Sequence, residues 1–289
     1  MSETFNLYLF KSEKQLTPFL QKEKKEGKKI GFVPTMGALH RGHISLIDKA
    51  KTECDIVVCS IFVNPTQFNN AKDLEKYPRP IEHDMEMLLA AGCTVLYLPS
   101  SNEIYPEGKP LLKEYDLGYF DKVLEAAFRP GHFQGVANVV FRLLKKVESD
   151  ILYLGRKDFQ QIQVIRKMIE IEKIPILIES CEIVREASGL AMSSRNVRLS
   201  EDAWHNASVI SQTLFFLVEK RNEFNSIKTL RTEGIKRLKA IPDSILEYLE
   251  VCDEETLRPI EIFIEGKPSV ILTAIWVDGV RLIDNVLIS

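Results

Sequence analysis

Short runs of β-branched and aliphatic residues alternate, over the first two thirds of the chain, with longer segments in which apolar residues recur every three or four positions. The short runs predict β-strands and the longer segments predict amphipathic helices, because strand side chains alternate between faces whereas a helix repeats every about 3.6 residues. The expected strands are 29–35, 55–65, 93–99, 150–155 and 174–184. The expected helices are 43–53, 81–92, 135–148 and 158–172.

Regular alternation of strands and helices is typical of parallel βαβ units. We therefore predict an α/β fold with a Rossmann-like, doubly wound parallel sheet. The run at 55–65 has apolar residues on both faces, as expected of a central strand. In such folds the ligand lies at the carboxyl ends of the strands, so the segments that directly follow the strands are the candidates for binding.

The pattern changes after Val184. Residues 185–200 are small, polar and aperiodic, as in an active-site loop or hinge. Helices are expected at 203–220, which Ser200 can cap, and at 226–240. Three strands are expected at 245–253, 268–277 and 280–288. We predict a Rossmann-like domain over 1–184 and a smaller α+β domain, which could close over a ligand as a lid, over 185–289.

Composition excludes several classes of protein. With 38 Lys and Arg against 41 Asp and Glu, the net charge is −3, which argues against a nucleic-acid partner. The N-terminal sequence lacks the features of a secretory signal and no apolar run is long enough to span a bilayer, so we expect a soluble, cytoplasmic protein. The cysteines are odd in number and form no C-x-x-C pair, so we expect reduced, buried thiols at Cys54, Cys59, Cys93, Cys181 and Cys252.

Two of the five histidines, His40 and His43, lie in one turn directly after the strand at 29–35. Gly37 and Ala38 allow the backbone of this turn to approach a ligand closely. Residues three apart share one helix face, and the first turn of a helix attracts anions through its unpaired N–H groups and its dipole. The pair therefore predicts a phosphate-binding turn, while a pair that only caps or packs the helix accounts equally well for a bare H-x-x-H spacing. No third ligand of matching spacing supports a metal site.

Two more clusters carry chemistry suited to phosphate. Gly155, Lys157 and Asp158 stand at the junction of a predicted strand and helix, where an ammonium group could reach a bound phosphate. The tripeptide at 193–195 supplies two hydroxyls and a guanidinium that keeps its charge at neutral pH. Each cluster alone is ordinary, but with the histidine turn the clusters predict one triphosphate-binding site.

Six strings of residues follow one another in the order of a known motif series. They are PTMGALHRGH, SIFVNPTQF, YPRP, RPGHFQGVANVV, GRKDFQQ and VREASGLAMSSRN, from about residue 29 to residue 196. This series resembles that of the pantoate–β-alanine ligases, or pantothenate synthetases. The histidine string resembles the HIGH signature of the wider nucleotidylyltransferase superfamily, and MSSRN stands where related enzymes have KMSKS.

The resemblance implies an AMP-forming ligase with two steps. ATP and pantoate would give pantoyl adenylate and pyrophosphate, and the amine of β-alanine would then displace AMP to form the amide of pantothenate. ATP and Mg²⁺ are the implied cosubstrate and cofactor. A homodimer is the implied assembly.

The resemblance also implies site residues, carried over position by position. ATP would be bound by Met36, Gly37, Ala38, Leu39, His40, Arg41, Gly42, His43, Gly155, Arg156, Lys157, Asp158, Val184, Met192, Ser193, Ser194 and Arg195. The residues implied to act in catalysis are His43 as proton donor, His40, Lys157, Ser193, Ser194 and Arg195. Gln67 would be shared by pantoate and β-alanine, Gln161 would be the second pantoate ligand, and Asp84 is implied to lie near the metal ion.

Four positions depart from the family pattern. Arg41 stands where an acidic residue is usual, and Arg156, Phe159 and Ser188 stand where glutamate, tyrosine and aspartate are usual. None of the four removes a proposed donor, so they bear on kinetic constants more than on the reaction.

Two alternative functions remain open at the level of sequence. One is a nucleotidylyltransferase that acts on a phosphorylated acceptor and uses no amine. The other is a non-enzymatic nucleotide-binding or tRNA-related module, which the acidic charge balance and the complete donor set disfavour. The glutamines in VNPTQF and KDFQQ favour the ligase.

Overall fold

The computed structural model describes residues 6–69, 71–106 and 113–288 of the 289-residue chain. The chain forms two compact units. Unit 1 comprises Met1–Arg156 and Gln161–Glu182, and unit 2 comprises Lys157–Gln160 and Ile183–Ser289. The predicted division after Val184 did not include the short segment that joins unit 2 from the middle of the chain.

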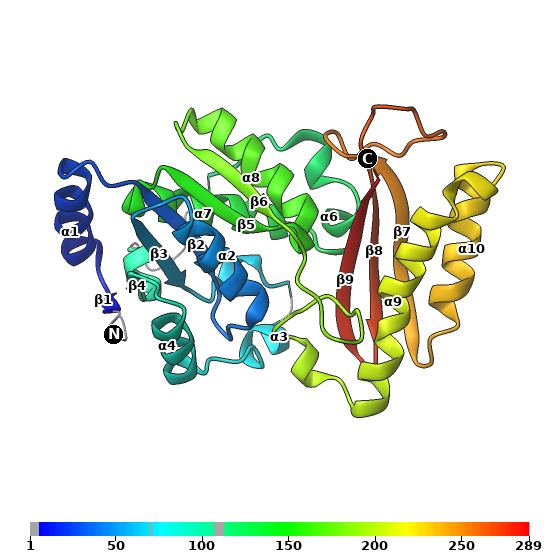
Figure 1. Ribbon diagram of the computed structural model, residues 1–289, viewed down its shortest axis with the longest axis horizontal. Helices are drawn as coiled ribbons and strands as arrows, with labels where there is room; N and C mark the ends of the chain where they lie inside the picture. The colour runs from blue at the N-terminus through cyan, green and yellow to red at the C-terminus, as the bar shows by residue number, and fades with distance from the viewer. Residues whose placement is uncertain (1–5, 70, 107–112, 289) are drawn as a thin grey trace. The chain divides into compact units, whose positions relative to one another are not determined.

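Unit 1 is built on a six-stranded parallel sheet with the order β1-β4-β3-β2-β5-β6 (Figure 1). Strands β3 and β4 follow β2 on one side of it, whereas β5 and β6 lie on its other side. The direction in which successive strands are added to the sheet therefore reverses between β2 and β5. The predicted doubly wound α/β sheet is therefore confirmed. The strands are β1 (Tyr8–Phe10), β2 (Ile30–Thr35), β3 (Ile56–Ile61), β4 (Val95–Tyr97), β5 (Ile151–Gly155) and β6 (Leu177–Cys181).

Helices cover both faces of this sheet. Because alternate strand residues face opposite sides, Phe32 of β2 packs into the core formed with α1, α7 and α8, whereas Val33 packs into the core formed with α2 and α4. The α-helices are α1 (Glu13–Lys25), α2 (Arg41–Lys51), α3 (Ala71–Glu75), α4 (Ile81–Ala90), α5 (Ser101–Ile104), α6 (Glu125–Phe128), α7 (His132–Val147) and α8 (Phe159–Glu172). Short 3₁₀ turns are η1 (Pro65–Gln67), η2 (Gly118–Asp121) and η3 (Arg156–Asp158).

The sequence prediction was wrong in several bounds. It missed β1, which has only three residues, and α1, in which charged residues outnumber the apolar ones. It also extended the last strand of the sheet over 174–184, whereas β6 pairs with β5 only from Leu177 to Cys181. As an edge strand β6 has a single neighbour, and its ladder ends where β5 ends, so the apolar residues beyond it do not continue the strand.

Unit 2 contains the antiparallel sheet β7-β8-β9, and α9 and α10 pack on one face of it (Figure 1). The prediction of a smaller α+β part after the parallel sheet is therefore confirmed. Ser200 caps α9 as predicted, since its Oγ accepts a hydrogen bond from Ala203 N at 3.4 Å. The elements are α9 (Glu201–Glu219), α10 (Ile227–Lys239), β7 (Ser244–Asp253), β8 (Ser269–Val277), β9 (Val280–Ile288), η4 (Asn196–Arg198) and η5 (Arg221–Glu223).

The cysteines are free thiols, as predicted, and all but Cys181 are buried. Burial raises the pKa of Cys93 to about 12 and raises that of Cys59 as well. These thiols therefore stay protonated near neutral pH and pack as small apolar side chains.

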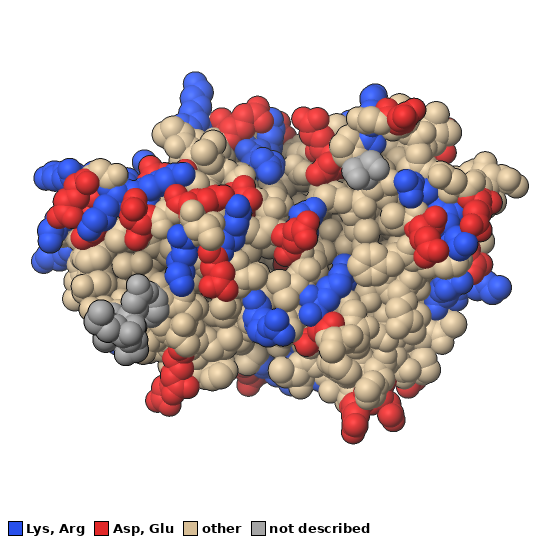
Figure 2. Space-filling model, viewed as in Figure 1, with Lys and Arg blue, Asp and Glu red and all other residues tan. Residues whose placement is uncertain are grey.

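On the face seen in Figure 2, Lys and Arg side chains are interspersed with Asp and Glu, so neither charge dominates that face. Within the described parts of the chain, no helix has both the length and the apolar character needed to cross a membrane.

Gly135 in α7 lies where this helix meets η1. A Cβ atom added at Gly135 would lie 2.5 Å from the carbonyl oxygen of Thr66 and 2.9 Å from the nitrogen of Gln67. Backbone would have to move, so we expect Gly135→Ala to lower the free energy of unfolding by about 1–3 kcal/mol despite the better helix propensity of alanine. Urea unfolding followed by circular dichroism measures this.

The matched control is Gly234→Ala in α10. There the added Cβ would approach the methyl ends of Leu249 and Leu217, at 2.5 and 2.7 Å, and these side chains can shift. We expect a smaller loss of stability at Gly234 than at Gly135. A larger loss of stability at Gly234 than at Gly135 would contradict the expectation that the backbone contact between α7 and η1 leaves no room for a Cβ atom.

Candidate active site

The turn between β2 and α2 has a conformation that its small residues make possible. Gly37 and Ala38 both adopt the left-handed region, with φ of 80° and 49°. A Cβ atom at Gly37 would also lie 3.0 Å from Asp84 Oδ2 and from Ile61 Cγ2. Thr35 secures the entry to the turn, because its Oγ1 donates to Ser60 O at 2.8 Å and accepts from Gly37 N at 3.2 Å.

Asp84 of α4 holds the middle of the same turn. Its side chain is 1% exposed, and Oδ2 accepts from Ala38 N at 2.9 Å while Oδ1 accepts from Leu39 N at 2.7 Å. Burial raises the pKa of Asp84, and the two backbone N–H groups act in the opposite direction. Both oxygens thus serve the turn, and the predicted proximity of Asp84 to magnesium stays a prediction.

His40 and His43 cap α2 together. His40 Nδ1 accepts from Gly42 N at 3.1 Å, His43 Nδ1 accepts from His40 N at 3.3 Å, and the ring centroids lie 4.0 Å apart. Because Nδ1 accepts in both rings, each neutral ring carries its hydrogen on Nε2. The capping interpretation is therefore correct, and Nδ1 is the atom of each ring that accepts the capping bond. Nε2 of each ring is the atom that can donate to an anion at this helix N-terminus.

Gln67 at the end of η1 is held in one orientation. Its Oε1 accepts from Asn64 Nδ2 at 3.1 Å, which turns Nε2 toward Met36 Sδ at 2.9 Å. Asn64 is fully buried, and its Oδ1 accepts from Tyr105 OH at 2.8 Å and from Thr66 N at 3.3 Å. The structure thus brings Gln67 against the histidine turn through Met36.

The main chain of Gln67 is also fixed. Its carbonyl oxygen accepts from His132 Nδ1 at 2.8 Å and from Arg129 Nη2 at 3.3 Å. The sequence pattern gave no role to Asn64 or Tyr105. The only signal for Asn64 was its place directly before Pro65, where a polar residue follows a buried strand.

The remaining predicted residues of unit 1 lie at the end of β5 and the start of α8. Gly155 is the last residue of β5, and Arg156 follows it with Nη2 at 3.4 Å from Glu182 Oε1. Gln161 lies partly exposed in the first turn of α8.

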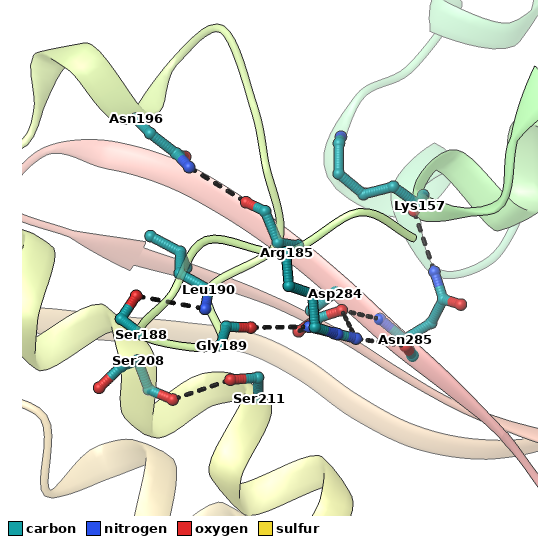
Figure 3. Close-up of polar contacts among 11 residues, drawn as sticks. Lys157, Arg185, Ser188, Gly189, Leu190, Asn196, Ser208, Ser211, Asp284 and Asn285 are labelled. Carbon is teal, nitrogen blue, oxygen red and sulfur yellow. Dashed lines mark hydrogen bonds and ion pairs between the residues drawn. The ribbon is translucent and has the colours of Figure 1, made fainter. Parts of the chain in front are cut away.

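Lys157 belongs to unit 2 by its contacts. Asn285 of β9 donates from Nδ2 to the carbonyl oxygen of Lys157 at 3.0 Å (Figure 3). The ammonium group lies 3.0 Å from Asp158 Oδ2, and the lysine side chain is 20% exposed. It is therefore accessible to a ligand while its backbone is anchored.

Residues 185–200, predicted to be an aperiodic loop, begin with a small hairpin. Val184 O accepts from Met192 N at 3.0 Å, and Arg185 forms a bridge with Ala191. Arg185 also forms a bidentate ion pair with Asp284, with distances of 2.7 and 3.0 Å. The hairpin leads into the residues predicted to bind phosphate, where Ser193 Oγ accepts from Arg195 N at 3.2 Å.

The predicted residues therefore form two groups. Unit 1 brings together the histidine turn, Asp84 and Gln67, and it also carries Gly155, Arg156 and Gln161. Unit 2 contains Lys157, Asp158, Val184, Met192, Ser193, Ser194 and Arg195.

Comparison with known proteins gives consistent results. Residues 8–287 match the family model described as pantoate-beta-alanine ligase. The chain is 44% identical over 284 residues to the pantothenate synthetase of Porphyromonas gingivalis, covering 96% of this chain and 98% of the relative. It is 44% identical over 278 residues to that of Cytophaga hutchinsonii, covering 96% and 98%.

Solved structures agree with the sequence relatives. The pantothenate synthetase of Thermus thermophilus has a TM-score of 0.89 and 38% identity, covering 96% of this chain and 98% of that one. The pantoate-beta-alanine ligase of Francisella tularensis, complexed with beta-gamma ATP and beta-alanine, has a TM-score of 0.80 and 36% identity, covering 98% of each. With similarity of this extent over nearly its whole length, the chain belongs to the pantoate–β-alanine ligase family.

Proposed function

We propose that this chain condenses pantoate with β-alanine at the expense of ATP, through a pantoyl adenylate, and releases pyrophosphate and AMP. The observation that carries the proposal is the histidine turn, in which backbone N–H groups donate to Nδ1 of His40 and His43, so that the hydrogen of each neutral ring is on Nε2. The relative from Francisella tularensis, complexed with beta-gamma ATP and beta-alanine, supports the choice of substrates.

The first step requires a pantoate carboxylate oxygen to attack the α-phosphorus while pyrophosphate departs. Catalysis of such a step consists mainly of positioning the reactants and of stabilising charge on the phosphate oxygens. His40 and His43 are proposed to donate from Nε2, with His43 acting as the proton donor. Lys157, Ser193, Ser194 and Arg195 of unit 2 are proposed as further donors to phosphate oxygens.

Gln67 is proposed to bind pantoate. Because Asn64 occupies its carbonyl side, Gln67 presents N–H groups, and its Nε2 contacts the weakly accepting sulfur of Met36. A pantoate oxygen would be a better acceptor in that place. Gln161 is proposed as the second pantoate ligand.

We propose that a magnesium ion enters the site with the nucleotide. No group of three or more His, Cys, Asp or Glu side chains that could hold a metal occurs among the described residues, and both oxygens of Asp84 accept backbone N–H groups. Mg²⁺ at nucleotide sites is often held by one or two carboxylates, substrate phosphates and water, so few protein ligands are needed. When bound, the ion would neutralise charge on the phosphate oxygens.

We also propose a cytoplasmic homodimer. A two-fold symmetric pair is the commonest assembly of soluble enzymes. Sedimentation equilibrium distinguishes it from a monomer.

Pyrophosphate release tests the activity. ATP and pantoate together should give pyrophosphate, and AMP should appear when β-alanine is added, because the amine completes the second step. If pyrophosphate forms only with a phosphorylated acceptor, and the AMP group is transferred to that acceptor without release of free AMP, the chain is a nucleotidylyltransferase instead. If neither product forms with any acceptor, the ligase assignment is wrong.

His43→Ala should lower the rate of adenylation about a hundredfold, since loss of one donor to a developing oxygen charge costs roughly 3 kcal/mol of barrier. Single-turnover pyrophosphate release measures it. The control is His205→Ala on the exposed side of α9, which should keep normal turnover. Normal adenylation by the folded His43→Ala variant would be incompatible with the proposed role.

Asp84→Asn separates a structural from a metal-binding role. An amide has one acceptor oxygen, so one N–H of the turn loses its partner and the free energy of unfolding should fall by about 1–3 kcal/mol. If Asp84 acts only on the turn, the Mg²⁺ concentration that gives half-maximal adenylation stays the same. A marked rise in that concentration without loss of stability would instead make Asp84 a magnesium ligand.

A further inference from the structure

Two adjacent residues of β9, Asp284 and Asn285, hold two segments of unit 2 that are far apart in sequence (Figure 3). Neighbouring strand residues point to opposite faces of a sheet, so the pair can contact both sides of β9. Both side chains are almost completely buried, with exposures of 3% and 2%.

Asp284 holds the hairpin that leads to the phosphate-binding tripeptide. Its two carboxylate oxygens accept from Arg185 Nη1 and Nη2 at 2.7 and 3.0 Å. Arg185 Nη1 also donates to Gly189 O at 3.1 Å, and its guanidinium lies 4.9 Å from the ring centre of Phe215. A bidentate pair of this kind fixes direction as well as distance, so the base of the hairpin has one position relative to β9.

Asn285 holds the segment that carries Lys157. Its Nδ2 donates to the carbonyl oxygen of Lys157 at 3.0 Å, and its backbone N donates to Asp284 Oδ1 at 2.7 Å. The second bond also fixes Asp284. The bond from Nδ2 joins the segment Lys157–Gln160, which follows β5, to β9.

We propose that Asn285 is a positioning residue for the adenylation step. Through the carbonyl of Lys157 it fixes the backbone from which the ammonium group extends to the same strand that holds the hairpin before Ser193–Arg195. The two segments that carry the phosphate donors are thereby attached to one strand, which pre-positions the donors for a developing charge. This inference rests on the proposed function.

The test is Asn285→Leu, which keeps the approximate volume and removes the donor. We expect kcat/KM for ATP in pyrophosphate release to fall about tenfold, the ratio that loss of one buried hydrogen-bond partner brings. KM for β-alanine should not change. Asn285→Ala, which cannot overpack the site, is measured alongside in case the leucine variant fails to fold.

Thr273→Val is the matched control. Thr273 is fully buried in the neighbouring strand β8, pairs in register with Asp284, and donates from Oγ1 to Tyr248 O at 2.8 Å. Its loss should lower the melting temperature as loss of Asn285 does, but kcat/KM for ATP should stay within about twofold of the unaltered enzyme. A variant of Asn285 that only loses stability, with unaltered kcat/KM for ATP, overturns the proposal.

A double variant asks whether Asn285 acts through Lys157. In a Lys157→Ala background, Asn285→Leu should cause no further fall in kcat/KM for ATP, because the positioned group is already absent. Two effects that multiply would overturn the proposal, since Asn285 would then act by another route.

Binding of a non-hydrolysable ATP analogue, followed by calorimetry, gives a readout that needs no turnover. Asn285→Leu should weaken this binding severalfold, and unchanged binding together with unchanged kcat/KM overturns the proposal. If the unaltered enzyme binds the analogue but never releases pyrophosphate with pantoate, the ligase assignment fails and the role of Asn285 in nucleotide binding is still decided by the calorimetry.

Discussion

The carboxylate of Asp84 and the two backbone N–H groups that it accepts are the interaction on which the candidate site depends. The turn that follows β2 contains two residues in the left-handed region, a conformation that alanine adopts only at a cost. A buried acceptor that bonds both Ala38 N and Leu39 N offsets that cost. Since α2 starts directly after the turn, the positions of His40 and His43 follow from this contact.

In unit 2 a buried carboxylate, that of Asp284, also orients a segment of the chain, but it accepts from the side chain of Arg185 and not from backbone N–H groups. Burial raises the pKa of Asp284, while the ion pair with Arg185 favours its charged form. A buried ion pair is poor evidence for net stability, but it specifies geometry when its hydrogen bonds are satisfied. Here it sets the hairpin from which Ser193–Arg195 follow. In both units a buried carboxylate orients a backbone segment, and the groups suited to phosphate lie on that segment.

Backbone and side-chain amides complete the arrangement. Asn64 fixes which end of the Gln67 amide is presented, and Asn285 fixes the carbonyl of Lys157. An amide suits this role because it donates and accepts without titrating, so the orientation does not depend on pH. Gln67 and Lys157 are thus each held by a neutral amide, in addition to the buried carboxylates that orient the histidine turn and the hairpin.

The sequence by itself predicted the strands from β2 to β9 and the longer helices between them, because apolar periodicity depends only on which faces are buried, but it did not predict β1 and α1. It also determined the candidate donors, since each follows a predicted strand or lies in the loop after Val184. Only the tertiary structure decided what holds them. Asp84 meets the histidine turn across 45 residues, and Asn285 meets Lys157 across 128. Such contacts produce no pattern in the local sequence, because they depend on how distant segments pack. The contact with Asn285 is also one of those that place Lys157 in unit 2.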